Sequence, residues 1–142
     1  TIDEADPAKS SFDFTVKTDS VDTANPARDS HLKNTAFFNA KQFPAITFKS
    51  RSAASAGPGK LEVTGDLTLH GVTKPVVLDV VLSDEAVDPK EWGGNTHRGA
   101  KVSGTINRKD FGLTWQKQLD KGGVVAGEDV ALQINAELVK KK

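Results

Sequence analysis

Hydrophobic and polar side chains alternate with a period of two along most of this chain. Between Ser11 and Thr18, for example, Phe12, Phe14 and Val16 alternate with polar residues. This period places the apolar side chains on one face of a β-strand. Six segments share the pattern and are predicted to be strands: Ser11–Thr18, Ile46–Lys49, Leu61–His70, Val76–Ser83, Lys101–Asn107 and Val130–Val139. Strands with one polar and one apolar face are typical of an antiparallel sheet.

The connections between these segments favour the same interpretation. Gly71–Lys74, followed by Pro75, predicts a tight hairpin between two strong strands. Ala56–Gly59 predicts a second turn, and Asp84–Gly99 a longer loop. Short turns join neighbouring antiparallel strands, so the sheet is predicted to be built mainly from hairpins.

One segment departs from the alternation. A short helix is predicted near Arg28–Asn34, because the pair Asn25-Pro26 is typical of a helix start. Asp29 would then lie in the first turn, where a negative charge is favourable. An apolar cluster follows the helix and consists of Phe37, Phe38 and Phe43.

A sheet with one apolar face must cover that face, and one short helix is too small to do so. Closing the sheet into a barrel, or packing two sheets as a sandwich, solves this problem. The pattern therefore predicts an all-β barrel or sandwich, and a barrel of about eight strands is wide enough to hold one small ligand.

Composition narrows the possible functions. The chain has 142 residues, which suits a single domain over 1–142, and equal numbers of basic and acidic residues, 19 each. Such a balance argues against a nucleic-acid partner. There is no Cys, which excludes disulfides and thiolate metal sites, and no apolar run approaches the ~18 residues of a membrane-spanning helix. Because the chain starts at Thr1 and contains no Met, we expect a processed product that has lost an export signal.

Candidate catalytic groups are few. The sequence contains no phosphate-binding loop, dinucleotide fingerprint, zinc-protease motif or nucleophile elbow. His31, His70 and His97 are widely separated, so no metal site is predicted. Ser30 lies between Asp29 and His31, but neighbours on a helix point in different directions and do not form a relay. The alternation also turns most carboxylates and lysines outward. The protein is therefore predicted not to be an enzyme and to need no cofactor.

Several aromatic residues have two possible roles. Trp92 and Trp115 either plug the ends of the barrel or line the mouth of a ligand site. The Phe37, Phe38 and Phe43 cluster likewise either seals one end or contacts a ligand.

Four blocks of the sequence, in order, resemble the YceI-like family. They are Ser20–Thr23, Arg28–Lys33 with the phenylalanine-rich stretch to Phe48, Gly65–Val76 (GDLTLHGVTKPV), and Ile106–Leu113 (INRKDFGL). The resemblance implies an elongated lipocalin-like barrel, exported to the bacterial periplasm or beyond. It also implies a lumen that holds a long isoprenoid, a quinone-like isoprenoid or a fatty lipid for transport or sequestration.

The chain departs from the family in its number of strands. Family barrels have eight strands, whereas six are predicted here, and the family usually begins with two strands before the position of Thr1. Either the N-terminal hairpin of the family is absent, or the barrel closes in another way. An open edge at Ser11–Thr18 would also allow two chains to pair as a homodimer.

Lipid binding is the leading functional prediction, and a β-sandwich interaction module with a solid core is the alternative. Arg28, Lys33 and Arg108 are candidates for holding a polar head group, although a solvated surface position is favoured for each. The predicted ligand-binding side chains all project from one face or belong to the phenylalanine cluster: Phe12, Phe14, Val16, Phe37, Phe38, Ile46, Phe48, Val63, Leu67, Leu69, Leu78, Val80, Val102, Ile106, Leu132 and Ile134.

Overall fold

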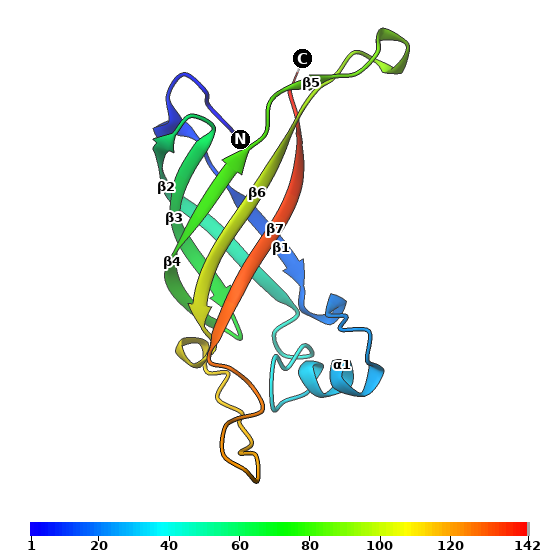
Figure 1. Ribbon diagram of the computed structural model, residues 1–142, viewed down its shortest axis with the longest axis vertical. Coiled ribbons are helices and arrows are strands. Elements are labelled where there is room, and N and C mark those ends of the chain that lie inside the picture. Colours follow the sequence, from blue (N-terminus) through cyan, green and yellow to red (C-terminus); the bar gives the residue numbers. More distant parts are fainter. Residues whose placement is uncertain (142) are drawn as a thin grey trace.

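The computed structural model describes residues 1–141 and contains one antiparallel sheet of seven strands. The strands are β1 (Asp13–Lys17), β2 (Ala45–Gly57), β3 (Lys60–Leu69), β4 (Val72–Leu82), β5 (Ala86–Val87), β6 (Thr96–Asn107) and β7 (Asp129–Val139). They follow one another as β1-β2-β3-β4-β6, with β5 and β7 both pairing with β6. Figure 1 shows the sheet curling into an elongated half-barrel.

The remaining elements are short and lie at the two ends of the sheet. The one α-helix, α1 (Pro26–Lys33), lies below the sheet in Figure 1. Four 3₁₀ turns complete the fold: η1 (Pro7–Lys9), η2 (Thr18–Ser20), η3 (Lys90–Trp92) and η4 (Arg108–Phe111).

The predicted antiparallel, lipocalin-like architecture is confirmed, and the sandwich alternative is wrong because all strands belong to one sheet. The predicted helix start is also confirmed, since Asn25 caps α1 by accepting a hydrogen bond from the Arg28 amide (3.1 Å). The number of strands differs from the prediction, because the two-residue β5 is too short to show an alternation.

Some strands are longer than the alternation indicates. The segment predicted as Ile46–Lys49 is part of a strand of 13 residues, whose second half is rich in small and polar residues that obscure the pattern. Val72–Lys74, predicted to belong to a turn, already pairs with β3. The hairpin turn itself is His70-Gly71, where both residues have positive φ, as a two-residue turn between twisted strands requires.

The core lies on the concave face of β2, β3 and β4. It consists of inward-facing residues of these strands together with residues from β6, η4 and the segment after it: Phe48, Ala53, Leu61, Val63, Leu67, Leu69, Val76, Leu78, Val80, Ala100, Ile106, Phe111 and Leu113. Gly65 continues the inward series without a side chain. A Cβ there would lie 2.5 Å from the Phe48 ring, so glycine lets the ring cross β3.

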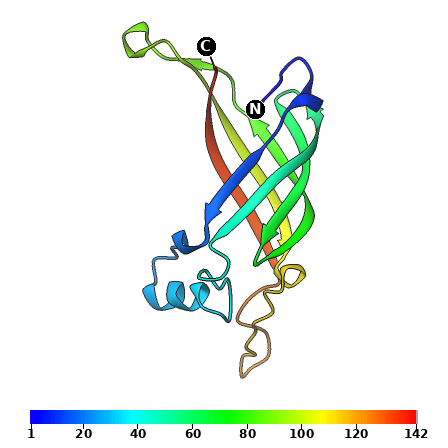
Figure 2. The ribbon, with the colours of Figure 1, turned by 180° about the vertical axis from the view of Figure 1, so that it is seen from behind.

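The two outer strands of the curled sheet, β1 and β7, are not paired with each other in the described structure. Figure 2, seen from behind, shows both strands running along the length of the molecule. We call the lengthwise opening between β1 and β7 the seam. The sheet therefore does not close into a complete barrel over residues 1–141.

Candidate functional site

The candidate site is the concave face of the sheet, and alternation places most of the predicted ligand-binding residues on it. Those on the central strands are buried and pack together as the floor of the half-barrel: Phe48, Val63, Leu67, Leu69, Leu78 and Val80. Ile106 of β6 is buried beside them. Because these side chains already fill the space between the central strands, they leave little room for a ligand at the floor.

The predicted residues on the outer strands are only half-buried. Phe12 lies just before β1, Phe14 belongs to β1, and Leu132 belongs to β7; these three pack against the core while keeping part of their surface accessible. Ile134 of β7 is half-buried as well. Ile46 and Val102 behave in the same way, and Val16 is exposed. Phe14 also stacks on Phe48, with ring centroids 5.2 Å apart. The apolar surface that remains accessible on the concave side therefore lines the seam.

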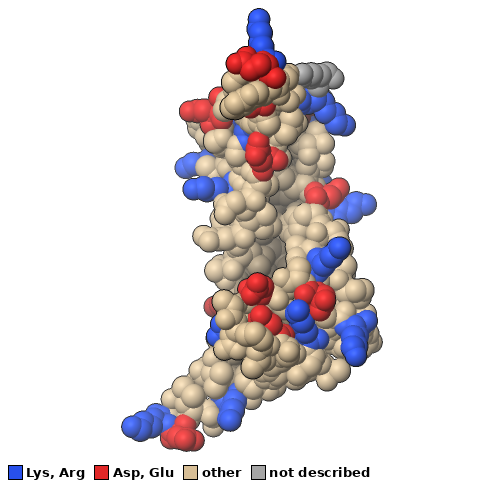
Figure 3. All heavy atoms as spheres, turned by 90° about the vertical axis from the view of Figure 1, so that its right-hand side faces the viewer, with Lys and Arg blue, Asp and Glu red and all other residues tan. Residues whose placement is uncertain are grey.

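Figure 3 shows this side of the molecule, where uncharged residues border a furrow that runs lengthwise between two ridges. The inward series of β7 continues through Ala136, which is exposed and pairs with the buried Ala100 of β6. Sequence reasoning missed these two alanines because small side chains add little to a hydrophobic pattern. The period of two could have identified both, because Ala136 continues the inward series of Leu132 and Ile134, and Ala100 continues that of Val102.

Phe37 and Phe38 lie outside the sheet, at the end of the half-barrel near α1. Phe37 packs against His31 and Trp115, with ring centroids 5.1 Å and 5.0 Å away, and His31 lies 4.9 Å from Trp115. Phe38 packs against the core. These contacts join α1 to the segment that leads into β7, so this aromatic cluster covers the lower end of the sheet.

The two tryptophans have different surroundings. Trp115 belongs to the aromatic cluster, in agreement with a role in covering one end. Trp92 is 73% exposed and lies on the hairpin of residues 84–96, which projects beyond the sheet in Figure 1. The expectation that Trp92 plugs or lines the barrel is therefore wrong, because the hairpin carries it away from the concave face.

The three candidates for binding a head group are occupied by structural contacts. Arg28 donates hydrogen bonds to Thr23 (2.8 Å to both Oγ1 and the carbonyl oxygen), and Lys33 lies 3.5 Å from Asp19. Arg108 is only 5% exposed and donates to the carbonyl oxygens of residues 113, 126 and 127. Its expected surface position is wrong: its guanidinium replaces the backbone partners that this loop lacks.

Ser30, His31 and Asp29 do not act together. Asp29 accepts hydrogen bonds from the Thr23 amide and hydroxyl (2.8 and 2.6 Å), and the hydroxyl in particular lowers the pKa of this carboxyl. The ring of His31 belongs to the aromatic cluster instead. Within the described part of the chain, no three His, Cys, Asp or Glu side chains converge as a metal ion would require.

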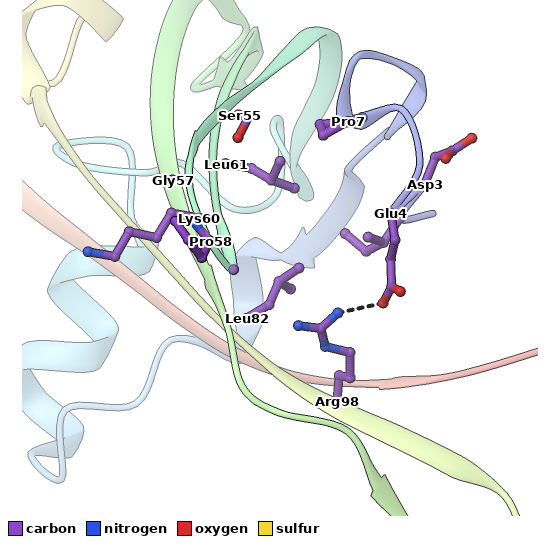
Figure 4. Close-up of a pocket in the computed structure, with 12 residues that line it drawn as sticks. Asp3, Glu4, Pro7, Ser55, Gly57, Pro58, Lys60, Leu61, Leu82 and Arg98 are labelled. Atoms are coloured by element: carbon purple, nitrogen blue, oxygen red, sulfur yellow. Dashed lines mark hydrogen bonds and ion pairs between the residues drawn. The ribbon is translucent and has the colours of Figure 1, made fainter.

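An open pocket of about 530 Å³ lies at the upper end of the sheet, between the N-terminal segment and the β2–β3 turn. Figure 4 shows Arg98 and Glu4 facing each other across it, with Nη1 and Oε1 2.5 Å apart. Arg98 also donates to the Ser83 carbonyl oxygen (2.8 Å). Leu61 and Leu82 form its apolar side. The ion pair holds the N-terminal segment across the upper end of the concave face.

A second open pocket, of about 490 Å³, lies where β4 and β6 diverge below their paired residues. Ile106 is the one predicted ligand-binding residue that lines it, beside Lys74 and Asp110. Neither pocket is lined mainly by the predicted ligand-binding residues. Those on the outer strands, which keep accessible surface, lie along the seam instead.

His97 ties the upper hairpin (residues 84–96) to the sheet. Its Nε2 lies 2.8 Å from Asp88 Oδ2 and its Nδ1 lies 2.5 Å from Glu137 Oε1. The hydrogen bond to Asp88, reinforced by the charge of Glu137, raises the pKa of His97 above its ordinary value of 6.5.

This contact predicts a pH dependence. Because the pKa of His97 is higher in the folded than in the unfolded chain, its stabilising effect is complete below about pH 6.5 and disappears as the pH rises through the raised value. Hydrogen exchange of the upper hairpin should therefore be faster at about pH 8.5 than at about pH 5.5, after correction for intrinsic rates. His97→Gln should remove most of this difference. An equal pH effect in the variant would contradict the assignment.

The single curled antiparallel sheet, with its apolar concave face and short helix at one end, defines a lipocalin-like half-barrel. The model of the YceI-like domain matches residues 1–138. The chain therefore belongs to the YceI-like domain family, as its sequence blocks indicated.

Individual relatives agree with this assignment. The chain is 41% identical over all 142 residues to Protein YceI of Salmonella arizonae, and equally to that of Salmonella paratyphi B, and it spans 69% of each. A crystal structure of the Campylobacter jejuni YceI protein superposes with a TM-score of 0.85 at 31% identity, over all of this chain and 79% of that one. Burkholderia cenocepacia BcnA shares the fold, with a TM-score of 0.81 at 23% identity, over 97% of this chain and 80% of that one.

Proposed function

We propose that this protein binds a long apolar lipid, such as an isoprenoid or a fatty chain, along the concave face at the seam. The observation that carries the proposal is the contrast between the two parts of that face: a packed floor on β2–β4, and half-buried apolar side chains along β1 and β7. Phe12, Phe14, Val16, Leu132 and Ile134 would contact the ligand directly. The predicted residues of the floor would support them.

The energetics favour a long ligand over a short one. Burying one methylene is worth about 0.8 kcal/mol, so a chain of about a dozen methylenes gains about 10 kcal/mol before the costs of binding are subtracted. Those costs are about 4–15 kcal/mol. A furrow open along its length contacts a long chain at many points, whereas a short ligand gains too little to offset the loss of its freedom.

The protein would act as a carrier or a sequestering protein rather than as an enzyme. The alternation turns most carboxylates and lysines to the convex side, so the seam offers apolar contact and few groups for acid–base chemistry. Among residues 1–141, no helix combines the length and apolar character needed to cross a bilayer. We place the protein in the bacterial periplasm, by analogy with the family, as an exported single-domain protein. The free edge of β1 would also allow two chains to pair as a homodimer.

Mass spectrometry of the native protein tests the proposal. Protein purified without detergent should carry a lipid that organic extraction releases, and the extracted protein should take up a fluorescent isoprenoid. A clean mass before extraction, together with no uptake afterwards, would overturn the proposal.

A pair of substitutions locates the ligand on the protein. Ala136→Trp places a large ring in the seam from the inward face of β7, and is expected to weaken uptake of the fluorescent isoprenoid by about tenfold or more, because the ring occupies the volume of the chain. Ala131→Trp is the matched control, since it adds the same ring to the outward face of the same strand. Equal affinities of the two variants would show that the ligand lies elsewhere.

A further inference from the structure

Three apolar side chains are unusually exposed on the loop that precedes β7. Leu119, Val124 and Val125 are each between 50% and 52% exposed, and they occupy a small hairpin closed by a bridge between Gln118 and Val124. This loop is the lowest part of the molecule in Figures 1 and 3. We call residues 117–125 the tip. About half of the surface of each of these three side chains is therefore accessible at the end of a projecting loop.

The base of this loop is held firmly while the tip projects. The Arg108 guanidinium donates to carbonyl oxygens at residues 113, 126 and 127, and Trp115 packs in the aromatic cluster. Gln116 closes the neck, donating to the Ala126 carbonyl oxygen (2.6 Å) and accepting from the Ala126 amide (3.2 Å). The tip is therefore presented in a defined position below the sheet.

The backbone of the tip forms its own hydrogen bonds. The amides of Leu119, Gly122 and Val125 donate to the carbonyl oxygens of Gly123, Leu119 and Lys117, at 3.0–3.1 Å. These three bonds reduce the number of backbone groups that would lose hydration without a partner if the tip entered an apolar medium.

The charges of the tip favour a negatively charged surface. It carries Lys117 and Lys121 against one acidic residue, Asp120. The lysines that form ion pairs at this end of the molecule are Lys33 and Lys109, which leaves Lys117 and Lys121 unpaired within residues 1–141. In contrast, the upper hairpin (residues 84–96) carries four acidic residues and one lysine beside its exposed Val87 and Trp92.

The tip also lies at the end of the sheet where the seam is flanked by exposed apolar side chains. Val16 ends the inward series of β1 and Val130 begins that of β7; both are exposed, and both lie at the end of their strand nearest the loop. At the opposite end, the Arg98–Glu4 ion pair holds the N-terminal segment in place. A lipid moving between the seam and a bilayer would thus meet apolar surface along the path beside the tip.

We infer that the tip docks the protein on an anionic phospholipid surface, with Leu119, Val124 and Val125 inserted at the level of the head groups and Lys117 and Lys121 facing the lipid phosphates. Such binding grows with the buried apolar area and with the attraction between lysines and anionic lipids. Docking in this position brings the lower end of the seam to the bilayer. The inference rests on the proposed lipid-binding function, because it assigns the surface from which the ligand is loaded or to which it is delivered.

Flotation with vesicles tests the inference. Wild-type protein should bind vesicles of phosphatidylcholine and phosphatidylglycerol, and bind vesicles of phosphatidylcholine alone more weakly. Leu119→Ser combined with Val124→Ser is expected to lower the partition coefficient of the protein between solution and the anionic vesicles by about tenfold. Lys117→Gln combined with Lys121→Gln should remove the preference for the anionic vesicles. The matched control is Val87→Ser with Trp92→Ser, which removes even more exposed apolar side chains from the acidic upper hairpin and should bind as wild type does.

Uptake of the fluorescent isoprenoid, measured in solution without vesicles, separates this inference from the function on which it rests. Both tip variants should take up the probe as wild type does, which also shows that they are folded. Failure of wild-type protein to bind vesicles while it takes up the probe would overturn the docking surface and favour delivery through a protein partner. Equal losses in the tip and upper-hairpin variants would overturn it as well. Tip-dependent vesicle binding without any uptake would support the docking surface and overturn the carrier function.

Discussion

Val80→Asp is expected to destabilise the fold by about 3–5 kcal/mol, which is a large fraction of the roughly 5–15 kcal/mol by which most native domains are stable. Val80 is 1% exposed and belongs to the core on the concave face of β4. A carboxylate there loses its hydration and finds no partner among the surrounding apolar side chains, or it must take up a proton at the expense of stability. Leu67→Asp, at a buried position of β3, is expected to have a similar effect for the same reason. Urea denaturation followed by circular dichroism measures both.

The matched control for this pair is Val77→Asp. Val77 lies on the same strand but is 50% exposed on the convex face, where a new carboxylate stays hydrated. This variant should unfold within about 1 kcal/mol of wild type, as most surface substitutions do. Similar midpoints for Val80→Asp and wild type would mean that the concave and convex faces are assigned the wrong way round, and the proposed lipid site would be lost with them.

Arg108→Met is expected to destabilise the protein by about 2–4 kcal/mol and to loosen the loop between η4 and β7. The guanidinium donates to the carbonyl oxygens of Leu113, Gly127 and Ala126 at 2.5, 2.7 and 3.4 Å. Methionine fills a similar volume but supplies no donor, so these carbonyl groups lose charge-assisted hydrogen bonds at a largely buried site. In the variant, hydrogen exchange should become faster than in wild type, and this increase should be larger for residues 112–128 than for β3.

Lys109→Met is the matched control, because Lys109 is the next basic residue along the chain. Its ammonium group pairs with Glu128 at a partly exposed position, and this pairing lowers the pKa of the Glu128 carboxyl. Loss of an exposed ion pair is expected to change the stability by at most about 1 kcal/mol. Equal effects of the two substitutions would show that the loop is not held by the Arg108 guanidinium. Arg108→Lys should be intermediate, since one ammonium group cannot reach all the carbonyl oxygens that the planar guanidinium contacts.

Local pattern was enough to predict most of the fold. The alternation of Leu61, Val63, Leu67 and Leu69 predicts a half-buried strand, because a period of two places every second side chain on the same face. The sequence also predicted a turn beginning at Gly71 and the start of α1 at Asn25-Pro26, because each depends on the conformational preferences of neighbouring residues. The turn was placed too far along the chain, since it consists of His70-Gly71 and the strand resumes at Val72. Strand β2 was underestimated because its second half contains small and polar residues.

The candidate site was less accessible from the sequence. Alternation identified the apolar face but not how deeply each residue on it is buried. Val63 and Leu132 both face inward, yet Val63 is fully buried whereas Leu132 keeps accessible surface. The difference arises because β3 lies in the middle of the curled sheet and β7 lies at its edge. Trp92 and Arg108 were misplaced for a related reason. Whether a side chain projects from a hairpin or turns into a loop depends on partners far away in the chain.

By itself, the sequence determined the antiparallel strands, the face that each turns inward, and the family, because these depend on side chains that are close together along the chain. Only the tertiary structure decided which apolar residues become the packed floor and which line the seam, since that depends on where the curling sheet leaves two edges unpaired. It also placed Arg108 at the base of the loop that carries Leu119, Val124 and Val125. Burial is set by contacts between distant segments, and no local period records those contacts.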